Sequence, residues 1–189
     1  MRIEFGKTKF DGVYEVATVG SHVDERGYLA RTFDSTLFEE QGIDITWVQQ
    51  SLSYTVKKQT VRGLHTQRTP FKEIKLITIV TGRMFWVVTD LRKNSPTFGQ
   101  WQAVVLEPDK TNGLFVDGGF AHGCVSMTDD CYLVLNTDNY FSAEHGIGIL
   151  WDDPDLNIDW PLQADSPGGA GVHSDYITFK EFKETYGGL

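Results

Sequence analysis

The feature that most constrains the fold of this chain is a succession of short, strand-like segments rich in apolar residues. They run from Gly12 to Val19, Ile74 to Val80, Met84 to Leu91, Trp101 to Glu107 and Cys131 to Thr137. Apolar residues that alternate with a period of two are typical of β-strands with one buried face. Because turn residues separate these segments at the spacing of a sandwich or barrel, the pattern predicts an all-β fold.

Shorter segments extend this prediction. The chain from Val23 to Phe33 reads as extended, and Leu114 to Val116 reads as a further strand. Thr81-Gly82-Arg83 stands between two strand-like segments, so we expect a hairpin there.

Helix signals are few. Thr36 and Glu39 have the spacing of a capping box, and Thr178 and Glu181 repeat it near the C-terminus. Without internal repeats, 189 residues suit one domain with a full core. We therefore predict a single domain, residues 1–189, built as a double-sheet jelly-roll barrel with short peripheral helices. The segment Asp165 to Gly171 is the nearest thing to a linker.

Composition excludes some classes of function. A formal net charge of −9 argues against nucleic-acid binding, which needs a broad basic surface. Cys124 and Cys131 lie in apolar runs without metal-ligand spacing, so we expect small core residues in a reducing compartment. Because we find neither a leader pattern nor an apolar run long enough to cross a bilayer, we expect a cytoplasmic protein that does not bind membranes.

Two segments set a histidine beside glycines in an apolar, strand-like context. They are Val61 to Gln67, which contains His65, and Gly119 to Gly123, which contains His122. Two imidazoles that face one cavity, with Arg62 available for an anionic group, suggest a small-molecule site.

Six motifs follow one another in a characteristic order. They are Asp24-x-Arg26-Gly27, Val48-Gln49, Arg62 to His65, Leu91-Arg92 with Ser95 to Gly99, Gly119 to Gly123, and Asp153-Pro154 with Ile158 to Pro161. In this order, from about Val13 to Pro161, the chain resembles the dTDP-4-dehydrorhamnose 3,5-epimerase family of cupins.

The resemblance implies a cupin-type jelly roll and an epimerase of deoxysugar and surface-polysaccharide biosynthesis. Such an enzyme inverts C3, C5 or both of a nucleotide-linked 4-keto-6-deoxy sugar through an enolate. No metal or redox cofactor is implied. Family members are homodimers in which the N-terminal strand can reach the partner's sheet.

Inverting a carbon beside a ketone requires a base, a group that holds the enolate and an acid on the opposite face. His65 suits the base, because an imidazole titrates near neutral pH. The resemblance implies that Lys75 reaches the keto oxygen, where its charge stabilises the enolate; a solvent-facing lysine is the alternative. Asp175 is the candidate carboxylate that orients His65, although a surface role is also open.

The resemblance also implies a set of substrate contacts. Arg26 and Arg62 stand where the family grips the diphosphate, a task that suits the forked guanidinium, with surface ion pairing as the alternative. Gln49 matches a substrate contact, and His122 lines the pocket. Tyr140 and Phe141 stand where the family places aromatic residues against the nucleotide base, with core packing as the alternative.

The chain departs from the family at the acid. Thirteen residues after His122, where the family has its tyrosine, this chain has Leu135, which cannot donate a proton. Tyr132 lies an odd number of residues away, so in a strand it points to the opposite face. The proton could come from Tyr140, Tyr54 or water, or the enzyme inverts only one carbon.

Two further departures concern the nucleotide or the sugar. Arg31 replaces a glutamate and Ser51 replaces an asparagine of many family members. A guanidinium only donates hydrogen bonds whereas a carboxylate only accepts them, so the contacts offered to a base or sugar change. The nucleotide diphosphate is therefore left open among dTDP, CDP and GDP.

Two other functions remain open from the sequence. In the first, His65, Glu73 and His122 hold a divalent metal, as in metal-dependent cupins. In the second, the loss of the acid at Leu135 leaves a sugar-nucleotide binding protein without catalysis. Metal content distinguishes the former, and binding without proton exchange distinguishes the latter.

Overall fold

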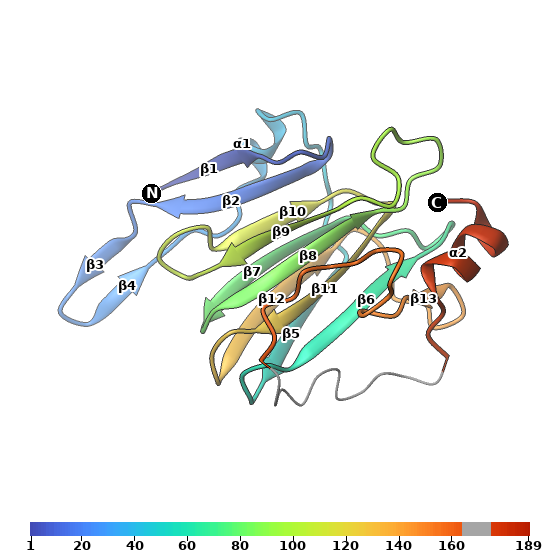
Figure 1. Cartoon of the computed structure of the whole chain (residues 1–189). Helices are drawn as coiled ribbons and strands as arrows, with labels where there is room; N and C mark the ends of the chain where they lie inside the picture. Colours follow the sequence, from blue (N-terminus) through green and yellow to red (C-terminus); the bar gives the residue numbers. More distant parts are fainter. Residues whose placement is uncertain (164–174) are drawn as a thin grey trace.

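The computed structural model describes residues 1–163 and 175–189, which form two facing β-sheets with a short hairpin and two short helices (Figure 1). The larger sheet has the order β1 (Arg2–Lys7), β2 (Val13–Val19), β10 (Gly113–Val116), β7 (Lys75–Thr81), β12 (Cys131–Thr137) and β5 (Gln49–Thr55). The smaller has the order β13 (Gly146–Gly148), β6 (Val61–Gln67), β11 (Phe120–Ser126), β8 (Met84–Asp90) and β9 (Trp101–Leu106). The remaining elements are β3 (His22–Asp24), β4 (Gly27–Leu29), α1 (Ser35–Glu39) and α2 (Phe179–Tyr186).

The main hydrophobic core lies between the two sheets. Ile77 and Leu133 of the larger sheet pack in the same cluster as Trp86 and Val104 of the smaller one. Alternate residues of each strand supply this core, and full burial of one such side chain contributes roughly 1.5–3 kcal/mol. The predicted all-β jelly roll with peripheral helices is confirmed.

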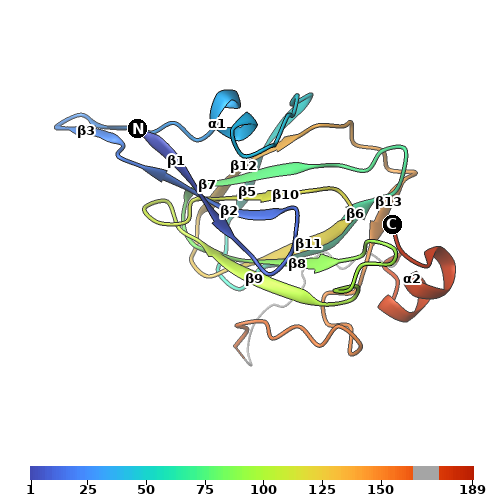
Figure 2. The same ribbon diagram turned by 90° about the horizontal axis from the view of Figure 1, so that it is seen from above.

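The outer faces of the sheets are covered unequally (Figure 2). The C-terminal segment and α2 pack on the smaller sheet through Phe179 and Phe182. On the larger sheet, α1 contributes Phe38 to a cluster over β1, β2, β10 and β7. The outer face of β5 and β12 is left more open, with Leu52 68% exposed.

The strands β5 and β6 stand at the side of the barrel where the site lies. β5 ends the larger sheet, and only β13 lies beyond β6 in the smaller one. No ladder joins β5 to β6 in the described part of the chain. Gln49 and Ser51 of β5 and His65 of β6 are exposed there, whereas Thr55 and Gln67 are buried.

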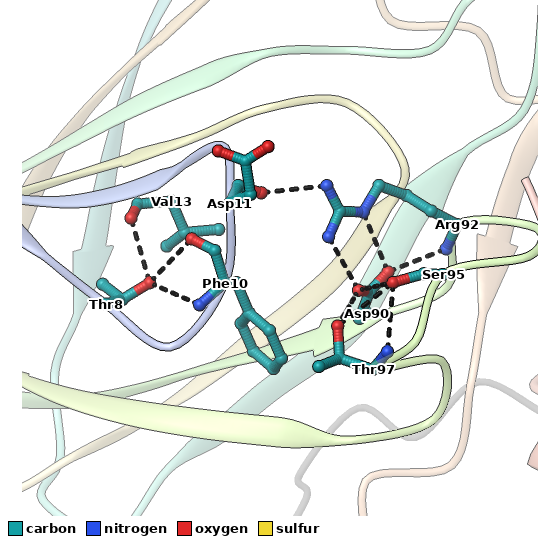
Figure 3. Close-up of polar contacts among 8 residues, drawn as sticks. All are labelled: Thr8, Phe10, Asp11, Val13, Asp90, Arg92, Ser95 and Thr97. Carbon is teal, nitrogen blue, oxygen red and sulfur yellow. Dashed lines mark hydrogen bonds and ion pairs between the residues drawn. The ribbon is translucent and has the colours of Figure 1, made fainter.

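A buried polar network stands where β8 ends (Figure 3). The carboxylate of Asp90 has no exposed surface and accepts hydrogen bonds from Arg92, Ser95 and Thr97 at 2.6–3.0 Å. Burial alone would raise the pKa of Asp90, but these donors outweigh it and lower the pKa to about 2. Arg92 also donates to the carbonyl of Asp11 at 2.9 Å, which ties the β1–β2 loop to β8.

The long strands β2, β7, β8, β9 and β12 agree with the sequence prediction within one or two residues, whereas β1, β5 and β13 were not predicted. The hairpin predicted at Thr81-Gly82-Arg83 is wrong, because β7 and β8 belong to different sheets. The turn carries the chain across the core instead. Gly82 has φ +85°, and a Cβ there would lie 2.5 Å from Sγ of Cys131.

The N-terminal part departs more from prediction. The segment from Val23 to Phe33 contains the hairpin β3–β4 in place of one extended strand. The capping box predicted at Thr36 is wrong, because α1 begins after Asp34, whose side chain makes no cap.

The capping box at Thr178 is confirmed, with Glu181 as its partner. The predicted linker, Asp165 to Gly171, lies outside the described residues. Neither described helix is long and apolar enough to span a membrane.

Candidate functional site

His65 and His122 lie directly opposite each other on β6 and β11. On β11, Phe120 and Cys124 point into the main core, so His122 between them points the same way. Residues opposite each other in an antiparallel pair share a face, and His65 therefore also points into the barrel. His122 is buried beside Trp86, with ring centroids 5.9 Å apart, whereas His65 is exposed.

Glycines allow the close approach of these two strands. The register between β6 and β11 shifts between His122 and Cys124. At this point a Cβ on Gly63 would lie 2.7 Å from the carbonyl oxygen of His122, and one on Gly123 would lie 2.6 Å from that of Arg62. The glycines beside each histidine therefore bring the backbones together where the two imidazoles meet.

Lys75 approaches this pair from the opposite sheet. It pairs with Val116, a residue of the main core, so its side chain also starts from the inner face. Burial lowers the pKa of His122 well below its usual value. The charge of Lys75 lowers it further, as does that of His65 whenever its imidazole is protonated. His122 is therefore a neutral imidazole at physiological pH.

Glu73 neutralises Lys75 within the site. Its carboxylate lies 3.0 Å from Nζ of Lys75, and the two side chains are 7% and 19% exposed. Burial raises the pKa of Glu73, while Lys75 holds it down in part. Sequence reasoning named Glu73 only as a metal ligand and missed this pairing, because a carboxylate two residues before a lysine is too common to signal a site.

The alternative metal site is not formed. Across residues 1–163 and 175–189, no three histidine, cysteine, aspartate or glutamate side chains are grouped so as to hold a metal ion. His65, Glu73 and His122 therefore do not make up the proposed ligand set.

The inner face of β5 supplies two more of the predicted residues. Gln49 pairs with Thr137 and Ser51 with Leu135, which packs against the main core. Gln49 accepts a hydrogen bond from the backbone N–H of Phe141 at 2.7 Å. The structure thus brings Gln49 and Ser51 to the inner face that His65 looks toward.

Tyr140 and Phe141 lie on the loop after β12, beside the starting end of β5 and the final end of β6. The carbonyl of Tyr140 accepts a hydrogen bond from Gln67 of β6 at 3.2 Å, and Phe141 binds Gln49 of β5. The two rings are 58% and 70% exposed, so they are not core residues. Exposed rings beside a polar site can stack on a flat ligand.

Arg62 lies three residues before His65 and bridges the two sheets. Its guanidinium donates to Oγ1 of Thr55 at 2.9 Å and to the carbonyl of Tyr54 at 3.0 Å, both on β5. The side chain remains exposed. A fixed, exposed guanidinium on this side of the barrel suits an anionic group.

The parity argument about the missing acid is confirmed. Leu135 packs against the main core, whereas Tyr132 stacks on Tyr54 with centroids 4.4 Å apart. Tyr54 in turn donates a hydrogen bond to Asp130 at 2.5 Å. Because Tyr54 and Tyr132 share the outer face, neither replaces the acid.

The structure does not bring Arg26 and Arg31 to His65. Arg26 stands in the turn of the β3–β4 hairpin, which projects away from β6 in both views (Figures 1 and 2). Its guanidinium binds Asp24, and its side chain is 82% exposed. Arg31, just after the hairpin, pairs with Asp34 at 3.1 Å.

Tyr176, a residue that sequence reasoning missed, contacts the predicted base. Its hydroxyl meets Nε2 of His65 in a short hydrogen bond. Asp175, the predicted orienting carboxylate, is its exposed neighbour in the chain. No local pattern marks Tyr176, because its contact with His65 spans 111 positions of sequence.

Known proteins similar to this chain are epimerases of nucleotide-linked sugars. The sequence profile described as dTDP-4-dehydrorhamnose 3,5-epimerase matches residues 7–176. A protein of that name from Methanothermobacter thermautotrophicus is 39% identical over 159 residues, which are 84% of each chain.

Solved structures give the same result. An epimerase from Legionella pneumophila, in complex with dTDP-4-keto-L-rhamnose, is 32% identical with a TM-score of 0.80, and the match covers 86% of both chains. A 3'-monoepimerase from Streptomyces bikiniensis, in complex with dTDP-quinovose, is 27% identical with a TM-score of 0.76. That match covers 84% of this chain and 82% of the other.

Proposed function

Because the chain belongs to the dTDP-4-dehydrorhamnose 3,5-epimerase family, we infer that it is an isomerase of deoxysugar biosynthesis. It inverts C3, C5 or both of a nucleotide-linked 4-keto-6-deoxy sugar. The observation that carries the assignment of roles is the meeting of His65 and His122 inside the barrel, with Lys75 on the opposite sheet.

His65 is the base in this proposal. Its exposed imidazole faces inward, so a sugar that enters beside β5 meets it without a rearrangement of the core. Removal of a proton next to the ketone leaves an enolate, and a positioned acid or base contributes on the order of 100- to 10,000-fold to such a step. His122, neutral and buried, forms the wall of the pocket.

Lys75 stabilises the enolate oxygen. A fixed cation near a developing negative charge is most effective where water is scarce, and its side chain is 19% exposed. Glu73 holds this cation in place before substrate arrives. On the other side, Tyr176 contacts His65, and the exposed Asp175 directly precedes Tyr176 in the chain.

The nucleotide lies toward the open side of the barrel. Arg62 binds the diphosphate, Gln49 and Ser51 bind sugar or nucleotide groups, and the exposed rings of Tyr140 and Phe141 stack on the base. Stacking does not discriminate strongly among bases. We propose dTDP rather than CDP or GDP as the nucleotide, because the Legionella pneumophila epimerase is in complex with a dTDP-linked keto sugar.

Proton exchange with solvent tests the function. Purified protein is incubated in deuterated buffer with dTDP-, CDP- or GDP-linked 4-keto-6-deoxy sugars, and deuterium at C3 and C5 is followed by NMR. We expect exchange with the dTDP-linked sugar, lost by at least about 100-fold in His65→Asn and in Lys75→Met. The control is Lys180→Met, on the exposed face of α2.

Two outcomes would contradict the proposal. An absence of exchange with every sugar would exclude an epimerase, and tight binding without exchange would indicate a sugar-nucleotide binding protein. Exchange that persists in His65→Asn would leave the family assignment intact but remove His65 from the role of base.

The protein is a homodimer in this proposal, and the hairpin β3–β4 reaches the partner. The hairpin exposes Val23, Tyr28 and Leu29 at 73%, 65% and 64%. It carries Arg26, a predicted diphosphate contact, away from the site of its own chain. A dimer accounts for both facts. The hairpin of each subunit can bury its exposed apolar residues against the other subunit, and it can bring Arg26 to the site of that other subunit. Light scattering measures the oligomeric state, and a monomer would exclude this arrangement.

A further inference from the structure

The hydroxyl of Tyr176 binds the nitrogen that a base needs. It meets Nε2 of His65, and the two rings stand edge to face with centroids 5.6 Å apart and an interplanar angle of 83°. The contact comes from the segment before α2, far from β6 in sequence. Neither the resemblance nor the motifs assign a role to Tyr176.

Gly148 leaves the space that the ring of Tyr176 occupies. In β13 it lies directly opposite His65, so its missing side chain would point to the same face as the imidazole. A Cβ on Gly148 would come within 2.7 Å of Cγ of Tyr176 and closer still to the ring edge. The glycine therefore seats the phenol beside the histidine.

The backbone on both sides of Tyr176 is fixed. Ile177 forms a parallel bridge with Ile149: its N–H donates to the carbonyl of Gly148, and its carbonyl accepts from Leu150, both at 3.0 Å. Two residues later, α2 begins with the capping box of Thr178 and buries Phe179. Tyr176 is thus held between two anchored segments.

The phenol is in its neutral form. Burial raises the pKa of Tyr176, and the charge of Asp175 raises it further. A neutral hydroxyl can donate to Nε2 only while that nitrogen carries no proton. Because a phenol donates hydrogen bonds better than it accepts them, this contact favours the neutral imidazole.

We propose that Tyr176, seated on Gly148, is a positioning residue that orients the imidazole of His65 and keeps Nε2 unprotonated. The inference rests on the proposed function in one respect, since it assumes that His65 is the base. Substrate takes the place of the hydroxyl at Nε2, so the contact belongs to the resting site. Before substrate binds, Tyr176 therefore keeps Nε2 oriented and unprotonated, so that this nitrogen can accept the proton.

The first test measures the protein without substrate. The pKa of the His65 imidazole is followed by NMR, with its signal identified from the spectrum of His65→Asn. In Tyr176→Phe, which keeps the ring, we expect this pKa to rise by about half a unit to one unit. Tyr186→Phe on α2 is the matched control and should leave the titration unchanged. An unchanged pKa in Tyr176→Phe would overturn the inference.

The second test is kinetic. The acidic limb of the pH profile of kcat/KM should move to higher pH by the same amount in Tyr176→Phe. The reason is that a higher pKa leaves more of the His65 imidazole protonated at each acidic pH, and a protonated imidazole cannot act as the base. Gly148→Ala, which displaces the ring without touching its hydroxyl, should produce the same shift. If both variants keep the profile of the unmodified protein, Tyr176 has no such role.

The two proposals fail separately. If His65→Asn retains exchange, the assignment of the base is wrong, yet the NMR titration still reports whether Tyr176 controls the imidazole. If His65 is essential while Tyr176→Phe titrates and reacts like the unmodified protein, the positioning role alone is wrong.

Discussion

The two facing imidazoles of the barrel differ in what surrounds them. His122 is buried, and its lowered pKa keeps it neutral. His65 lies at the open side with Tyr176 on Nε2. The same residue type thus supplies a wall at one position and a candidate base at the other, because burial disfavours a charged imidazole.

Because Leu135 cannot donate a proton, the site has a group that removes a proton from the sugar but lacks the expected group that returns one on the opposite face. Exchange with solvent needs only the base, whereas inversion needs a donor on the opposite face. Leu135 packs into the core at the position from which that donor is expected. We therefore expect exchange at C3 or C5 to be faster than inversion at the same carbon.

Leu135→Tyr tests this expectation. A hydroxyl at this position should raise the rate of inversion at least about tenfold relative to the unmodified protein, with a smaller change in exchange. Leu135→Phe adds the ring without the hydroxyl and controls for packing. The two rates come from one NMR time course of deuterium uptake and product formation. An equal inversion rate in both variants would contradict the explanation.

At the scale of elements, the end of β8 shows how a buried carboxylate is held. Asp90 is fully buried, yet Arg92, Ser95 and Thr97 satisfy it (Figure 3). An aspartate in an unfolded chain titrates near pKa ~3.9, so the folded protein binds this proton more weakly. The depressed pKa contributes stability above pH ~4, which is lost as the pH falls toward about 2.

Asp90→Asn should therefore destabilise the fold and remove part of its acid sensitivity. We expect a loss of about 3 kcal/mol or more at neutral pH, since the guanidinium of Arg92 loses its carboxylate. Between pH ~4 and ~2 the free energy of unfolding should fall by about 2 kcal/mol less than in the unmodified protein. Urea denaturation at each pH measures both values. Asp155→Asn, at an exposed pair with Lys183, should change neither.

The sequence predicted the strands better than their partners. A period of two depends on residues within one strand, so β2, β7, β8, β9 and β12 were found nearly to the residue. The turn after β7 reads as a hairpin because Gly82 permits a positive φ. The sequence around the turn does not indicate that β8 belongs to the other sheet. That assignment depends on the burial of the inner faces of both sheets against each other.

At the scale of the whole molecule, the position of Arg26 is the main question. Arg26 lies in the turn of the β3–β4 hairpin, which projects away from β6, the strand that contains His65 (Figure 1). If the partner's hairpin completes the site, two defective subunits can rescue each other.

Mixing Arg26→Ala with His65→Asn tests this rescue. Each variant alone should be nearly inactive. After denaturation and joint refolding, activity should return to about a quarter of the unmodified level, because half of the dimers are mixed and each has one intact site. The deuterium-exchange assay measures the rescue. Mixing His65→Asn with Lys75→Met provides the control, because both residues belong to one chain's site and no intact site can form.

The sequence by itself determined the all-β fold, the family and the inward-facing histidines. These features rest on local periodicity and on motifs whose residues stand close together in the chain. The sequence also predicted that Leu135 and Tyr132 point to opposite faces, because side chains alternate along every strand.

Only the tertiary structure decided which groups meet. It joined Glu73 to Lys75, set Tyr176 over Gly148 and against His65, and separated Arg26 from them all. These contacts depend on which strands pair and on where the C-terminal segment docks. Strand pairing and the docking of the C-terminal segment both follow from burial of apolar surface by the whole chain. A short segment of sequence therefore cannot predict these contacts.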